Sequence, residues 1–173
     1  MPTAFYRQLG TSISTITFTV ALGVFIYAVA SNLVSGLQAW LLFATSFLLM
    51  LRFWWRYSEL FVQFLPSRTF WHFLFDFAVS FFGILAVLSV NNMQTWALLG
   101  VLAMLSSAIR CALSWHAGRD IKQKLRRTFL GAVAMLIIMV IIHALASLIS
   151  QLSLAAAVFV IVLIFVAYSS QKP

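Results

Sequence analysis

The chain has 173 residues, of which 64% are hydrophobic and 8% are charged, and its formal net charge is +8. Soluble domains are about half apolar and about a quarter charged, so this composition excludes a water-soluble globular protein and predicts an all-α polytopic integral membrane protein. The single cysteine, Cys111, excludes an intrachain disulfide and a metal site built from cysteines.

Six long apolar segments follow one another along the chain. A hydrocarbon core about 30 Å thick requires roughly 20 helical residues, and the segments lack the period-2 alternation of a membrane barrel. Short linkers follow the first, third and fifth segments, which predicts three helical hairpins. We expect no cleavable signal peptide, because the first segment is long enough to span the membrane. The sequence therefore predicts one six-helix transmembrane domain over residues 1–173, with helices at about 12–34, 37–57, 70–90, 94–115, 128–149 and 152–170.

The distribution of positive charge predicts the orientation. Lysine and arginine collect in the cytoplasmic connections of membrane proteins. With the N-terminus inside, all 11 lysines and arginines lie on the inner side, and the three short turns carry none. We therefore predict that both termini face the cytoplasm, in the inner (plasma) membrane of a bacterium.

The first predicted helix carries a polar face over its inner half. Its candidate pore-lining residues are Ser12, Thr15, Thr19, Leu22, Gly23 and Ile26. The hydroxyl-bearing residues recur at helical spacing and give way to aliphatic ones, and a hydrophobic constriction of that kind gates a pore by dewetting. Small and hydroxyl side chains also let membrane helices pack closely. The pattern is compatible with either a pore-lining or a packing face.

Charged residues in the second and third predicted helices indicate an intramembrane ion pair. Arg52 lies about 9 Å inside the end of its helix, at about 1.5 Å per residue, where a charge is costly without a partner. Asp76 lies at the same depth if the connection bends symmetrically, so we predict an Arg52–Asp76 pair with His72 as a hydrogen-bond partner. This pair is either a staple between two helices or a gate or proton-linked site. Nearer the helix end, Arg56 and Glu59 have i,i+3 spacing and are predicted to pair.

A basic connection precedes the fifth predicted helix. It contains Arg119, Lys122, Lys124, Arg126 and Arg127. Each basic residue near an anionic leaflet contributes about 1 kcal/mol, which predicts binding to anionic lipids of the inner leaflet. The alternative is a site for an anionic ligand or a cytoplasmic partner protein.

Other polar residues carry weaker signals. We expect His143 to be neutral and hydrogen-bonded to a carbonyl or hydroxyl group, and Arg110 to extend its side chain to the interface. Gln38, Gln94 and Gln151 recur at nearly equal spacing, which indicates either tandem triplication of a hairpin or the common placing of polar residues at outer turns.

The sequence shows no catalytic constellation. It lacks a paired-carboxylate site and a phosphate-binding glycine-rich loop, and the spacing of His72, Asp76 and His116 is not diagnostic of a metal site. We therefore expect the chain not to be an enzyme, and we expect no cofactor, no metal and no nucleic-acid partner.

The stretch SFLLMLRFWWRYSELF, Ser46 to Phe61, resembles the second helix of the bacterial members of the lysosomal potassium channel family. These are six-span proteins with the signature S-F-L, then W, then H-H-x-L-F. The matching residues are Ser46, Phe47, Leu48, Trp54, Leu60 and Phe61. Tyr57 and Ser58 stand at the paired-histidine positions, and the family's R-x-x-x-F-S-D segment is represented only by GVF, residues 23–25. The resemblance implies a homotetramer whose first helix lines a cation pore with an aliphatic neck.

Three functions compete. The first is an oligomeric membrane channel or pore-forming protein that passes small ions, including an effector regulated from the cytoplasmic side. The second is a small transporter or substrate-binding membrane subunit, although the outer half of the spans is poor in polar groups. The third is a structural subunit of a membrane complex.

Overall fold

Helices make up almost all of the chain that the structure describes. The computed structural model describes residues 2–62, 69–115 and 119–170. They form α1 (Pro2–Ala30), α2 (Gly36–Arg56), the π-helical η1 (Tyr57–Val62) that continues α2, α3 (Phe70–Leu88), α4 (Met93–Leu113), α5 (Arg119–Leu145) and α6 (Gln151–Ser170). No strand occurs within these ranges, so the all-α prediction is confirmed for them.

Two helices begin well before the predicted residues 12 and 128. α1 starts at Pro2 and α5 at Arg119. The prediction followed the apolar part of each segment, whereas lysine, arginine and glutamine also form helices readily. The basic residues 119–127, which were predicted to lie in a connection, therefore lie on the first turns of α5.

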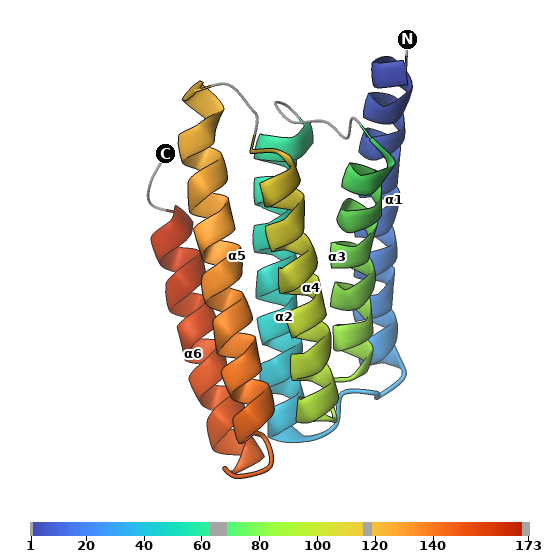
Figure 1. Cartoon of the computed structure of the whole chain (residues 1–173). Helices are drawn as coiled ribbons and strands as arrows, with labels where there is room; N and C mark the ends of the chain where they lie inside the picture. The colour runs from blue at the N-terminus through green and yellow to red at the C-terminus, as the bar shows by residue number, and fades with distance from the viewer. Residues whose placement is uncertain (1, 63–68, 116–118, 171–173) are drawn as a thin grey trace.

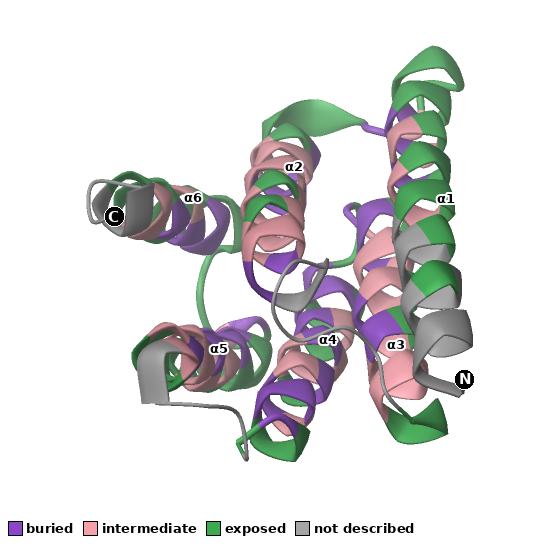
Figure 2. Cartoon of the chain, turned by 90° about the horizontal axis from the view of Figure 1, so that it is seen from above, coloured by how far each residue is buried: buried purple, intermediate pink, exposed green. Residues whose placement is uncertain are grey.

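Successive helices run in opposite directions (Figure 1). The turns at 31–35, 89–92 and 146–150 lie together at what we call the turn end. The starts of α1, α3 and α5 and the ends of α2, α4 and α6 lie at the opposite end, which we call the connection end. Seen along the bundle, α6, α2 and α1 form one row and α5, α4 and α3 the other (Figure 2). α4 packs on both α3 and α5, while α1 packs chiefly on α3 and α6 chiefly on α2.

Polar side chains link the turns at the turn end. Asn91 donates its side-chain amide to the Leu33 carbonyl oxygen, and its Oδ1 accepts from the Ser35 hydroxyl at 3.3 Å. Gln38 Nε2 donates to Gln151 Oε1 at 3.0 Å. Two of the three recurring glutamines therefore meet directly and tie the start of α2 to the start of α6.

The hydrophobic core surrounds Trp96 of α4. Trp96 is 1% exposed, and its indole N–H donates to the Ser46 hydroxyl at 2.8 Å, which satisfies the polar atom of a buried ring. Gly100, one turn along α4, allows Met139 of α5 to approach, since a Cβ built at this glycine would lie 2.9 Å from the Met139 sulfur. Accordingly, α4 joins α2 by a hydrogen bond and α5 by close packing.

Gly83 and Gly100 provide a matched test of this packing. Replacing a helical glycine with alanine gains about 0.8–1 kcal/mol of helix propensity. A Cβ at Gly83 would meet nothing within 4 Å, whereas at Gly100 the Met139 side chain must move. We expect Gly83→Ala to raise the midpoint of thermal unfolding in detergent by a few degrees, and Gly100→Ala to raise it less or to lower it. Equal shifts would contradict the close approach of α4 and α5.

Four helices of the described chain are long and apolar enough to cross a membrane. They cover Gly36–Leu60, Phe70–Leu88, Met93–Leu113 and Ile121–Leu145. α1 and α6 contribute the shorter apolar segments Thr15–Ala30 and Gln151–Ala167. Large apolar side chains such as Ile26, Trp55 and Ile164 are exposed on the outside of the bundle. Such a surface suits lipid rather than water, in agreement with a membrane protein.

Candidate functional site

A buried ion pair joins α3 to α4 near the connection end. Arg110 Nε donates to Asp76 Oδ1 at 2.9 Å, and the two side chains are 2% and 8% exposed. The Arg110 guanidinium also donates to the hydroxyl of Ser114, the C-cap residue of α4. Buried charges require such partners, and Arg110 obtains them from its own helix and from α3.

The partner of Asp76 differs from the predicted one. The sequence predicts Arg52 in this role and predicts that Arg110 extends to the interface, whereas the structure places Arg110 in a buried pair. The prediction assumed a symmetric bend between the second and third helices. The short turn at 89–92 was the better signal, because it makes α3 and α4 neighbours along their length.

His72 takes part in the N-terminal cap of α3. Oγ1 of Thr69, the N-cap residue, accepts from the His72 backbone N–H at 3.5 Å and lies 2.7 Å from His72 Nδ1. Caps of this kind satisfy backbone donors that have no partner within the helix. The structure therefore shows His72 in a capping contact, where the sequence predicted a contact with the ion pair.

A second charged group joins α2 and η1 to α5. Arg56 donates to Glu59 Oε2 at 3.0 Å, which confirms the predicted pair, and Lys124 Nζ donates to Glu59 Oε1 at 3.1 Å. The Lys124 contact was not predicted, because the sequence placed this lysine in a connection. One carboxylate thus holds the start of α5 against the end of α2.

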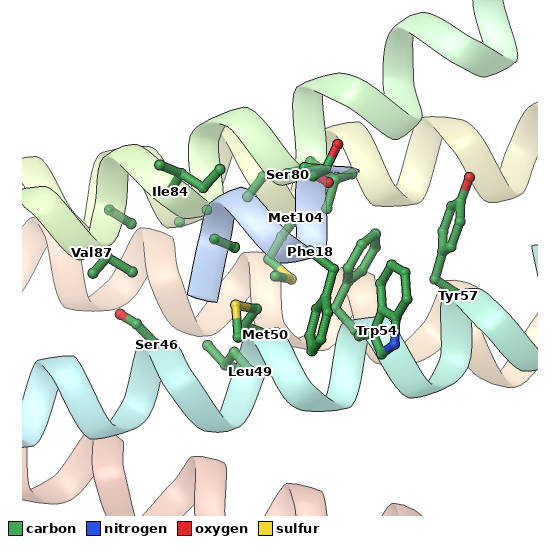
Figure 3. A pocket seen from close by; sticks show the side chains of 18 of the residues that line it. Phe18, Ser46, Leu49, Met50, Trp54, Tyr57, Ser80, Ile84, Val87 and Met104 are labelled. Carbon is green, nitrogen blue, oxygen red and sulfur yellow. The ribbon is translucent and has the colours of Figure 1, made fainter. Parts of the chain in front are cut away.

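An apolar cavity of about 110 Å³ lies between α1, α2, α3 and α4 (Figure 3). Phe18 of α1 stacks on Trp54 of α2 beside it, with ring centroids 4.4 Å apart. Asp76 and Ser80 contribute polar groups from α3, and Met104 lines it from α4. Dry cavities of about 150 Å³ can hold a benzene-sized molecule, so this one has room for a small apolar group beside the ion pair.

The predicted pore-lining residues lie on the outside of the bundle. Leu22 is half-buried, and the other residues are exposed: Ser12, Thr15, Thr19, Gly23 and Ile26. The Thr19 hydroxyl donates to the Thr15 carbonyl oxygen at 3.0 Å, so it is satisfied within α1. Because α1 stands at the edge of the bundle (Figure 2), a pore lined by this face has to lie between copies of the chain.

The basic residues of α5 divide between two environments. Lys122 and Arg126 are exposed, Lys124 contacts Glu59, and the side chain of Arg119 lies outside the described residues. Arg127 is exposed at the rim of a second cavity, of about 370 Å³, between α2, α4, α5 and α6. Arg52 and Arg56 of α2 line the same cavity. Successive residues of a helix point in different directions, so Arg127 lines this cavity and its neighbour Arg126 does not.

The contact of His143 agrees with its prediction. His143 Nδ1 lies 3.1 Å from the backbone oxygen of Gln94. A carbonyl oxygen only accepts, so Nδ1 carries the hydrogen, and the imidazole links α5 to the first turn of α4. Within the described ranges, no group of three or more histidine, cysteine or acidic residues is arranged to hold a metal ion.

Comparison with known proteins gives no match: no family model, no curated protein and no solved structure matches this chain.

Proposed function

We propose that this chain crosses the inner membrane of a bacterium six times, with both termini in the cytoplasm, and assembles into a homo-oligomer around a pore for small ions. The alternating helices support the orientation, because they bring Arg52, Arg56, Arg110 and the basic start of α5 to the connection end. Basic residues favour the cytoplasmic side. In this proposal the start of α5 is available to anionic lipids or to a cytoplasmic regulator.

The exposed hydroxyl face of α1 is the observation on which the pore rests. Thr15 and Thr19 are exposed on one face of α1, and other faces of the same helix are also exposed and can contact lipid. The bundle interior is a poor ion path, because its centre holds the fully buried Trp96 and Leu42 and an apolar cavity. In an oligomer that arranges the copies of α1 around a central axis, the exposed polar face of each α1 lines a water-filled pore. We favour a tetramer, in line with the resemblance of residues 46–61 to the potassium channel family.

Flux from liposomes tests the channel. The purified protein is reconstituted into vesicles with potassium, sodium or chloride gradients, and its oligomeric state is measured by native mass spectrometry in detergent. We expect cation flux that scales with protein content and a defined oligomer. A monomer without flux under any of the three gradients would contradict the proposal.

The internal cavity favours a second function, a membrane subunit that binds a small apolar substrate. The cavity lies beside Asp76 and Ser80, and small-molecule sites combine apolar walls with a few polar groups. We expect such a protein to gain thermal stability with a small apolar ligand such as xenon, and a filling substitution such as Ser80→Phe to abolish that gain. Flux without a ligand-dependent shift would favour the channel.

A further inference from the structure

We propose that the cavity between α2, α4, α5 and α6 at the connection end binds the phosphate headgroup of an anionic membrane lipid, with an acyl chain along its apolar wall. Its volume is about 370 Å³. This inference does not depend on whether the protein conducts ions.

The positive charge around this cavity favours binding of an anion. Arg52, Arg56 and Arg127 line it from two helices, and none of the described residues lining it is acidic. Glu59 lies nearby but is shared between Arg56 and Lys124. The chain holds 11 basic and 3 acidic residues, so positive charge is in excess. Arginine forks match phosphate oxygens by paired hydrogen bonds.

Both helices that carry these arginines change from charged to apolar with depth. On α5 the lining residues run from Arg127 and Thr128, through Gly131, to Met135. Arg127 and Met135 are therefore separated by about 12 Å at about 1.5 Å per residue. On α2 the arginines are followed, one turn deeper, by Leu49, and Phe165 of α6 adds a ring. A charged rim above an apolar floor fits an amphiphile better than a free phosphate.

The depth of the arginines also fits a lipid. Arg56 occupies the last position of α2, and Arg52 lies one turn further in. Basic pockets between membrane helices on the cytoplasmic side bind the headgroups of anionic lipids. The headgroup would meet Arg56 and Arg127 at the interface, while Arg52 would reach its phosphate from below.

Lipid binding to the full chain tests the site. The protein in a neutral detergent is titrated with phosphatidylglycerol, with cardiolipin, with phosphatidylcholine and with inorganic phosphate, and bound species are counted by native mass spectrometry. We expect the two anionic lipids to bind, and Arg127→Gln to weaken them about tenfold, the loss of one charge-assisted hydrogen bond. Because Arg127 is exposed, we expect this variant to fold. Its midpoint of thermal unfolding should equal that of the unsubstituted protein.

Arg126→Gln is the matched control. It removes the same charge from the neighbouring residue, which is exposed and does not line the cavity. We expect it to weaken binding by no more than about twofold, since a surface charge acts through a screened field. Ser107→Phe keeps every charge but fills the cavity, and we expect it to weaken binding as Arg127→Gln does. Equal losses for the two glutamine variants would overturn the site. Arg127-dependent binding of inorganic phosphate without lipid binding would overturn the lipid assignment.

Discussion

Asp76→Ala is expected to destabilise the folded protein by about 3–5 kcal/mol, the usual cost of removing one partner of a buried ion pair. The substitution leaves the Arg110 guanidinium, 2% exposed, without its carboxylate. Arg110 still has the Ser114 hydroxyl, but a neutral acceptor does not offset a buried positive charge. Thermal or denaturant unfolding in detergent, followed by circular dichroism, measures the loss.

A double-mutant cycle identifies the partner. Asp76→Leu combined with Arg110→Met replaces the pair with apolar side chains, which is often neutral or stabilising, so we expect the double variant to recover most of the stability lost in the single ones. The same cycle with Arg52→Met is expected to show coupling below about 0.5 kcal/mol, as for independent sites, because Asp76 makes its buried ion pair with Arg110. Stronger coupling to Arg52 than to Arg110 would contradict the structure.

Ile26→Asn is expected to raise the basal cation leak of reconstituted protein about tenfold or more. Ile26 follows Thr19 and Gly23 on the face of α1 that we propose lines the pore, and it is 69% exposed in the single chain. An aliphatic neck blocks ions by expelling water, and a polar amide lowers that barrier. Lowering a barrier by about 1.4 kcal/mol raises a rate about tenfold. Fluorescence-based flux from potassium-loaded vesicles is the measurement.

Ile164→Asn provides the control for this experiment. Ile164 is 62% exposed on α6, so the two variants place the same amide at similarly exposed positions on opposite edges of the bundle (Figure 2). We expect Ile164→Asn to leave the leak unchanged, because in the proposed oligomer α6 lies away from the axis that α1 surrounds. If both variants leak equally, polar substitution itself permeabilises the vesicle and α1 has no special role.

The pairing of Arg56 with Glu59 shows which side-chain contacts the sequence reveals. Both residues lie on one helix segment at i,i+3, so local geometry alone brings them together. The capping contact of His72 with Thr69 is of the same local kind, but the sequence assigns this histidine to the Arg52–Asp76 pair, because His72 has i,i+4 spacing from Asp76. Lys124 and Glu59 meet across helices, and nothing in their separation along the chain indicates it.

The two arginines near Asp76 show the limit of such reasoning. Position along a helix gives the distance from its end, at about 1.5 Å per residue, so the sequence identifies both Arg52 and Arg110 as charges near the ends of their helices. Which of them faces Asp76 depends on the neighbours of α3 and on helix rotation. Packing decides both, and α3 lies along α4 with the Arg110 side chain directed at the carboxylate.

The sequence by itself determined the helical composition and the succession of six helices in the described chain, because apolar length is read locally along the chain. Only the tertiary structure decided that α1 stands at the edge of the bundle, that Arg110 neutralises Asp76, and that Arg52, Arg56 and Arg127 share one cavity. Those relations join residues far apart in the chain, and they arise from the packing of whole helix faces.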